Sequence, residues 1–372
     1  MEFIDLKSQQ KKIRSKVEKR IHAILNHGKY IMGPEVYELE EKLADYVGVK
    51  HCISCSSGTD ALLMPLIAEG IGPGDAVLTT PFTYIATAEV ISLLGASPIF
   101  VDIYPETFNI DCSKIEKAIS DAKKMDLNPK AIIAVDLFGL PARYRLLEKI
   151  AKKHSLFLIQ DSAQGFGSSI RERKAGSFGN VSSTSFFPAK PFGCYGDGGA
   201  IFTNDKNLAE TMKSVRVHGS SSSDKYDNVR IGINGRLDTI QAAILLEKLS
   251  IFDGELESRK KSADFYNEEI DNLYNKQHIP EGYFSSRAQY SLLARSEDHR
   301  HRIMMSLQKL KIPTMIYYKI PLHLQQCFKS LKYQVGDFPI SENYSSRIFS
   351  IPMHPYLTIE QQSFIIEALN NA

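Results

Sequence analysis

Residues 156–164 read Leu-Phe-Leu-Ile-Gln-Asp-Ser-Ala-Gln, an apolar run that ends abruptly in polar side chains. A short run of this kind is typical of a strand that is buried on both faces of a sheet. Asp161 leaves the strand, and a carboxylate there is costly to bury unless a cation or a proton donor pairs with it. Asp161 is therefore a candidate functional residue, and a helix cap is the simpler alternative.

The same alternation of apolar strands and amphipathic helices runs through the N-terminal half of the chain. Strands are predicted at 51–55, 76–79, 98–102, 131–136 and 156–160, and two more at about 181–187 and 199–203. Helices are predicted at 59–69, 84–94, 114–122 and 142–153. The pattern predicts an α/β fold with a mostly parallel central sheet and helices on both faces.

The pattern changes on either side of this sheet. Helices are predicted at 6–26 and 35–47, and a long helix begins near Leu237 and runs past residue 260. A strand at 288–294 and helices at 298–309 and 358–370 then predict a smaller α+β domain. We place the boundary inside or close to the long helix, with a large domain over 1–250 and a small domain over 251–372.

Composition and charge exclude several classes of protein. The 372 residues suit two domains around one site, and an apolar content of 43% supports a substantial core. The net charge of +2 gives no strong field for nucleic acid or an anionic membrane. No run reaches the roughly 18 apolar residues of a membrane span, and the N-terminus does not resemble a signal peptide. We therefore expect a cytoplasmic protein.

Neither a metal site nor a disulfide framework is predicted. The five cysteines are scattered along the chain. Cys52 and Cys55 form a C-x-x-C pattern, but on a strand they point to opposite faces and cannot share a metal. The Walker A phosphate loop, H-E-x-x-H and EF-hand patterns are absent. The dinucleotide fingerprint is also missing, which disfavours a nucleotide-dependent oxidoreductase.

Ligands of an open α/β sheet bind at the carboxyl ends of its strands. After the first strand, Gly58 and Thr59 open a helix, whose free N–H groups can bind an anion; ordinary capping is the favoured alternative. After the second strand, Tyr84 could stack on a planar ligand, and a packed surface aromatic is its simpler reading.

The loop between the strands at 181–187 and 199–203 carries Lys190. This lysine lies between Pro188 and Pro191 and beside a glycine-rich turn, so its backbone is constrained. Apolar neighbours would lower its pKa and allow it to attack a carbonyl. A surface charge is the alternative.

Together these motifs resemble the DegT/DnrJ/EryC1/StrS family of sugar aminotransferases, which are fold-type I pyridoxal-phosphate (PLP) enzymes. The resemblance extends from residues 4–6 to 353–356. It is carried by residues 57–62, 161–164, 185–190, 196–199 and 234–238.

The resemblance implies a role for each candidate residue at the cofactor. Lys190 would bind PLP covalently and move a proton during the reaction, and Asp161 would pair with the pyridine nitrogen. Gln164 would hydrogen-bond the ring hydroxyl, and Tyr84 would stack on the ring. The implied phosphate contacts are Gly58, Thr59 and Ser185.

The resemblance also implies a homodimer with shared active sites. Asn234 would reach the phosphate from the neighbouring subunit, and Arg236 would meet the substrate from the same subunit. Tyr317 and Tyr318 stand where the family often has His-Tyr, near the sugar. A monomer is therefore expected to be inactive.

The implied reaction transfers an amino group from an amino acid, expected to be glutamate, to a nucleotide-linked keto-sugar. A UDP-2-acetamido-3-keto-hexuronate is the preferred substrate, in surface glycan biosynthesis, and a dTDP-3-keto-6-deoxy sugar is the alternative. Lys190 argues against the dehydratase branch, which carries histidine there. Another PLP reaction and a non-catalytic regulatory protein on the same fold are the remaining alternatives.

Overall fold

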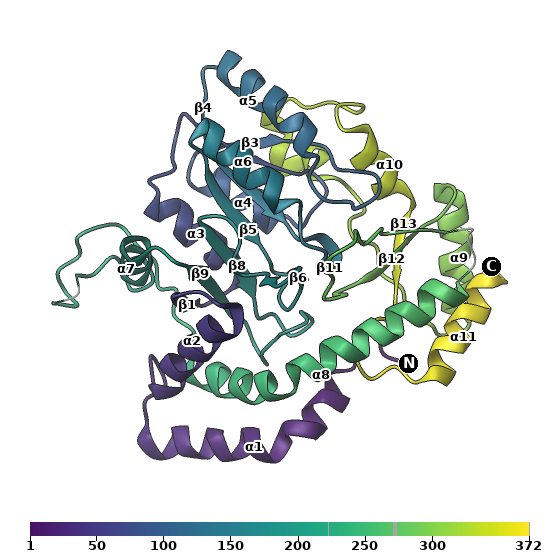
Figure 1. Ribbon diagram of the computed structural model, residues 1–372, viewed down its shortest axis with the longest axis horizontal. Coiled ribbons are helices and arrows are strands. Elements are labelled where there is room, and N and C mark those ends of the chain that lie inside the picture. The colour runs from purple at the N-terminus through teal and green to yellow at the C-terminus, as the bar shows by residue number, and fades with distance from the viewer. Residues whose placement is uncertain (222, 271–273, 372) are drawn as a thin grey trace.

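The computed structural model describes residues 1–221, 223–270 and 274–371. Its central sheet has seven strands in the order β1-β9-β8-β5-β4-β2-β3 (Figure 1). Their bounds in that order are His51–Cys55, Gly199–Thr203, Val181–Ser185, Phe157–Asp161, Asn128–Val135, Asp75–Thr79 and Ser97–Phe100. Within this sheet, β9 alone runs antiparallel to its neighbours, β1 and β8. The prediction of a mostly parallel sheet is confirmed.

Helices cover both faces of the sheet, as predicted. One face packs against α3 (Gly58–Ala68), α4 (Ala86–Leu93) and α7 (Lys206–Val215). The other packs against α5 (Ile115–Lys124), α6 (Tyr144–His154), α2 (Pro34–Val47) and α8 (Thr239–Glu269). Cys55 packs with the first set and Cys52 with α2 and α8, so their thiols lie on opposite faces, as expected.

The long helix α8 lies beside α1 (Leu6–His27) at the lower edge of Figure 1. Phe252 and Leu256 of α8 pack in the apolar cluster of α2 and β9. Tyr266, farther along the same helix, packs in a separate C-terminal cluster. The helix therefore belongs to both parts of the molecule, and the boundary at residue 250 stays a prediction.

The C-terminal part contains a three-stranded antiparallel sheet in the order β10-β12-β13. Its strands are Asn275–Lys276, Tyr290–Leu293 and Ile348–Ile351. The helices of this part are α9 (Glu297–Lys309), α10 (Pro339–Arg347) and α11 (Ile359–Asn370). A third sheet joins the two parts, in the order β11 (Tyr283–Phe284), β6 (Ser169–Ile170) and β7 (Arg173–Lys174). Short 3₁₀ helices occur at Cys112–Lys114, Leu137–Gly139, Leu322–Leu324 and Gln326–Leu331.

The start of α10 is capped by Asp102, which follows β3 of the central sheet. Phe338 precedes the helix and provides no side-chain cap. The buried carboxylate of Asp102 accepts hydrogen bonds from the backbone of Ile340 and Ser341, at 3.1 and 3.0 Å, and from the Ser341 hydroxyl at 2.6 Å. It therefore satisfies amide groups that no helical partner can reach.

Some predicted boundaries need correction. The helix predicted at 84–94 begins only at Ala86, so Tyr84 lies in a loop. The strand predicted at 181–187 ends at Ser185, because Phe186 and the residues after it turn away into the loop of Lys190. The helices α7 and α10 and the strands β6, β7, β10, β11 and β13 were not predicted.

The described residues include no helix that is both long enough and apolar enough to cross a membrane.

Candidate active site

Asp161 lies at the carboxyl edge of the central sheet, at the end of β5. Its side chain is 5% exposed and accepts hydrogen bonds from Thr87 Oγ1 at 2.9 Å and from the amide of Ala163 at 3.2 Å. Burial raises its pKa, while these two donors and the charge of Lys190 act in the opposite direction. Two proton donors therefore pair with this carboxylate, as the sequence argument allowed, and Lys190 acts on it through space.

Lys190 lies in the loop between β8 and β9. Its backbone amide donates to the carbonyl of Phe187 at 2.9 Å, and the side chains of Phe192 and Cys194 anchor the loop in the core. Burial lowers the pKa of Lys190, and Asp161 opposes this shift. No ion pair joins Lys190 to a carboxylate in the described part of the chain, so Asp161 acts on it through space.

Gly58 and Ser185 form a second group at the same edge. The hydroxyl of Ser57 caps α3 by accepting from the amide of Asp60 at 3.0 Å, so ordinary capping does occur here. A Cβ added to Gly58 would lie 2.5 Å from Cβ of Ser185, which places the start of the helix directly against this serine. The amides of Gly58 and Thr59 and the Ser185 hydroxyl could thus donate to one anion.

Gln164 and the two tyrosines of the C-terminal part form one side of the site. Gln164 Nε2 donates to the hydroxyl of Tyr318 at 3.0 Å. The ring of Tyr84 is 56% exposed, with its centroid 6.4 Å from that of Tyr318. Tyr317 lies against Phe3, also at 6.4 Å. The N-terminus and the C-terminal part therefore both border the site.

Among the described residues, no hydrogen bond or ion pair joins Asn234 or Arg236 to Asp161, Gln164 or Lys190. Asn234 is exposed, and its Oδ1 accepts a hydrogen bond from Arg236 Nη2 at 2.5 Å. Gly235, between them, accepts from the amide of Ser56 at 3.0 Å, which fixes the segment beside the start of α3.

Two polar residues near the site were missed by sequence reasoning. Thr87 lies inside a helix, and no local signal marks it. Asp136 directly follows β4, so the rule that identified Asp161 could have found it. Asp136 is fully buried and accepts from Tyr144 and Gln160, each at 2.7 Å, and burial raises its pKa to about 7.

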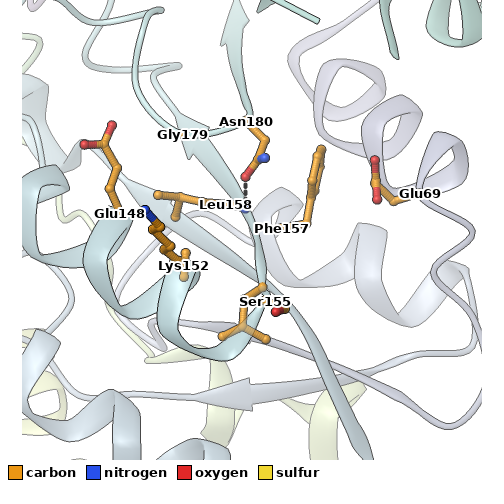
Figure 2. Close-up of a pocket in the computed structure, with 10 residues that line it drawn as sticks. Glu69, Glu148, Lys152, Ser155, Phe157, Leu158, Gly179 and Asn180 are labelled. Atoms are coloured by element: carbon orange, nitrogen blue, oxygen red, sulfur yellow. Dashed lines mark hydrogen bonds between the residues drawn. The ribbon is translucent and has the colours of Figure 1, made fainter. Parts of the chain in front are cut away.

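A separate pocket of about 490 Å³ lies at the opposite edge, where β5 begins (Figure 2). Glu69, Glu148 and Lys152 border it, and Asn180 accepts from the amide of Leu158 at 2.8 Å. Its place at the amino end of the strand separates it from Lys190. In the described ranges no three His, Cys, Asp or Glu side chains group as a metal site.

The residues at the carboxyl edge fit PLP. A lysine with a lowered pKa can bind its aldehyde carbon, and a buried carboxylate can pair with its pyridine nitrogen. The start of α3 and Ser185 offer donors for its phosphate.

Comparison with known sequences gives full-length matches. The model of the DegT/DnrJ/EryC1/StrS aminotransferase family matches residues 11–370. A UDP-2-acetamido-2-deoxy-3-oxo-D-glucuronate aminotransferase from Pseudomonas aeruginosa is 44% identical, over 100% of both chains. A pleiotropic regulatory protein from Geobacillus stearothermophilus is 39% identical, over 99% of this chain and 97% of its own. A dTDP-3-amino-3,6-dideoxy-alpha-D-galactopyranose transaminase from Aneurinibacillus thermoaerophilus is 37% identical, over 99% and 98%.

Solved structures match the fold over a similar length. A DegT/DnrJ/EryC1/StrS aminotransferase from Brucella abortus has a TM-score of 0.96 and 49% identity, over 100% of this chain and 99% of that one. NtdA from Bacillus subtilis, solved with the bound cofactor pyridoxamine phosphate (PMP), has a TM-score of 0.90 and 28% identity, over 99% and 82%.

Proposed function

This chain belongs to the DegT/DnrJ/EryC1/StrS aminotransferase family, and on that premise we propose that it transfers an amino group from glutamate to a UDP-linked 2-acetamido-3-keto-hexuronate. The general activity is that of a PLP-dependent aminotransferase acting on nucleotide-linked keto-sugars. The proposal of this specific substrate rests on the 44% identity, over the whole of both chains, with an aminotransferase of such a keto-uronate.

The proposed chemistry assigns separate tasks to Lys190 and Asp161. PLP, when bound, supplies an electron sink for the charge that develops as a proton leaves the amino-acid carbon. Lys190 holds the cofactor and then carries that proton, and its lowered pKa favours the neutral amine that both tasks require. Asp161 keeps a proton on the pyridine nitrogen.

The other proposed contacts orient the cofactor. Gly58, Thr59 and Ser185 donate hydrogen bonds to the phosphate, and Tyr84 covers the ring. Gln164 bonds the ring hydroxyl. Its Nε2 already points to the Tyr318 hydroxyl, so the same amide would connect the cofactor to the proposed sugar side of the site.

We propose a homodimer in which each subunit completes the site of the other. Within the described residues, Asn234 and Arg236 form no hydrogen bond or ion pair with Asp161 or Lys190 of their own chain, which supports a second copy that brings them to its partner's site. The neighbouring loop exposes Tyr226 and Ile231 by 79% and 87%. Exposed apolar side chains of this size favour burial against a partner.

The proposed sugar contacts are Arg236, Tyr317 and Tyr318. A uronate carries a carboxylate, and Arg236 of the partner subunit is the cation proposed to bind it. The second candidate substrate is a dTDP-linked 3-keto-6-deoxy sugar, which the 37% identical transaminase favours. The uronate product would serve surface glycan synthesis, and the cytoplasmic location stays a prediction.

The test follows the visible spectrum of the protein with PLP. Glutamate is added and then removed, and UDP-linked 3-keto-2-acetamido-glucuronate follows. Bleaching by glutamate and recovery with the keto-uronate would support both the donor and the substrate. Bleaching without recovery would reject the uronate and direct the next assay to dTDP-linked keto-sugars.

A Lys190→Ala variant tests the regulatory alternative, which the 39% identical regulatory protein keeps open. The enzyme proposal expects loss of the absorption band and of amination. A biological role that survives in this variant would instead favour regulation without turnover.

A further inference from the structure

The loop of Lys190 is held from one side of α8. Gln241 Oε1 accepts from the amide of Tyr195 at 3.0 Å, and Lys248 Nζ donates to the carbonyl of Gly193 at 2.5 Å. Gln241 and Lys248 are two helical turns apart, so they lie on the same face of α8. This face therefore binds the loop at two points, three and five residues after Lys190.

The loop has little freedom to move away from this face. A Cβ added to Gly193 would lie 2.4 Å from the carbonyl of Phe187, and one added to Gly196 would lie 2.9 Å from Gln241 Nε2. The amide of Cys194 also donates to the carbonyl of Phe186 at 2.7 Å. Movement of Gly193 would consequently pass to Phe187 and on to Lys190.

Lysine is an unusual residue to bury at a position that holds a loop, as Lys248 does. It is 1% exposed and forms no ion pair with the described carboxylates. Its Nζ lies 4.2 Å from the ring centroid of Tyr195, which provides a cation–π contact, and Glu255 acts on it only through space. A buried ammonium without a counter-ion costs stability, and an apolar side chain would pack there more cheaply. Stability alone therefore does not explain this lysine.

We propose that Lys248 is a positioning residue, which fixes Gly193 and thereby the direction in which Lys190 approaches the cofactor. The inference rests on the proposed role of Lys190 as the cofactor lysine. Gln241 supports the same loop through Tyr195.

The test compares Lys248→Met with the control Lys260→Met. Lys260 is on the same helix but exposed, and it pairs with Asp264 at 3.0 Å. Hydrogen exchange of residues 186–196 is measured first, without cofactor. We expect faster exchange in Lys248→Met and no change in Lys260→Met.

The loaded protein provides the second measurement. In Lys248→Met we expect the pH midpoint of the PLP absorption band to shift by at least about half a unit. We also expect bleaching by glutamate to slow about tenfold, because misplaced reacting groups react more slowly. Lys248→Gln keeps a donor and should recover part of both effects, and it replaces Lys248→Met if that variant does not fold.

The inference would be overturned if Lys248→Met matched the wild type in hydrogen exchange of the loop, in the pH midpoint of the PLP band and in the rate of bleaching by glutamate. It would also be overturned if a lowered melting temperature were the sole change in this variant. Borohydride reduction and peptide mapping separate this result from failure of the proposed function. If wild-type protein is not labelled at Lys190, the role of Lys190 falls and the inference with it.

Discussion

At the scale of single residues, the charge of Asp161 is the feature on which the proposed chemistry depends most. We expect Asp161→Asn to fold normally and to lose about 100-fold or more in turnover, because a neutral amide cannot keep the pyridine nitrogen protonated. Thr87→Val removes one hydrogen-bond donor and leaves the charge, so its loss should be much smaller. Steady-state kinetics with saturating PLP compare the two, and equal losses would contradict the proposed role of the charge.

Asp161 and Lys190 could be identified in the sequence because each stands out in its own segment. Asp161 ends an apolar strand, and Lys190 lies between two prolines. Thr87 could not be identified, because its hydroxyl becomes relevant only when the fold brings it to the carboxylate of Asp161 at the end of β5. The contact of Gln164 with Tyr318 joins residues far apart in the chain, and no local pattern encodes it.

At the scale of elements, the close packing at the start of α3 allows a test of the proposed phosphate site. A Cβ at residue 58 would collide with Ser185, so Gly58→Ala must displace the helix start or the serine. We expect PLP affinity to fall at least about tenfold, since both groups are proposed to bind the phosphate. Gly72→Ala is the control, because its added Cβ would meet only the carbonyl of Leu94 at 3.9 Å. Titration of PLP by absorbance measures both, and unchanged affinity in Gly58→Ala would argue against this phosphate site.

The cap of α10 makes a prediction about stability. Asp102→Ala removes the carboxylate that bonds Ile340 and Ser341, and we expect a loss of about 1–2 kcal/mol in the free energy of unfolding. Asp121→Ala is the comparison, because its exposed pairs with Lys117 and Lys124 contribute little. Urea unfolding distinguishes the two, and an equal effect would show that the cap is not important.

The start of α10 has no local capping signal. A capping residue directly before a helix, as Ser57 is for α3, is one sequence signal of a helix start, although α7 was missed despite its cap, Asp205. The cap of α10 instead comes from Asp102, on another part of the chain. The central sheet was easier to predict, because several of its strands, such as β4 and β5, carry their own apolar run.

At the scale of the whole molecule, the proposed shared active sites predict complementation between inactive variants. Lys190→Ala and Asn234→Asp should each be inactive as homodimers, the second because it places a negative charge beside the phosphate. Mixed dimers would contain one intact site, so random exchange should restore about a quarter of wild-type activity. Co-refolding at equal concentrations tests this, with each variant refolded alone as the control. No recovery despite proven exchange would reject the shared site.

His354 connects the N-terminus, α8 and the C-terminal part, and it predicts acid sensitivity. Burial and the charge of Arg259 lower its pKa from 6.5 to about 4. Below pH 6.5 the unfolded chain takes up this proton and the folded protein does not. Stability should therefore fall by up to roughly 3 kcal/mol as the pH drops from 6.5 through 4.

Melting temperatures between pH 4 and 7 measure this effect. His354→Gln should flatten the dependence, whereas replacement of the exposed His22 should leave it as in the wild type. An unchanged slope in His354→Gln would assign the acid sensitivity to other groups.

The order of strands has a consequence for synthesis on the ribosome. Within the central sheet, β1 pairs with β9 alone. Residues 56–198 are synthesised after β1 and before β9. The first strand to emerge must wait for the last one before it can join the sheet. The proposed phosphate donors that follow β1 and the lysine that precedes β9 are therefore brought together late, in one closing step. A nascent chain arrested before residue 199 should have a sheet that lacks β1 and should fail to retain PLP.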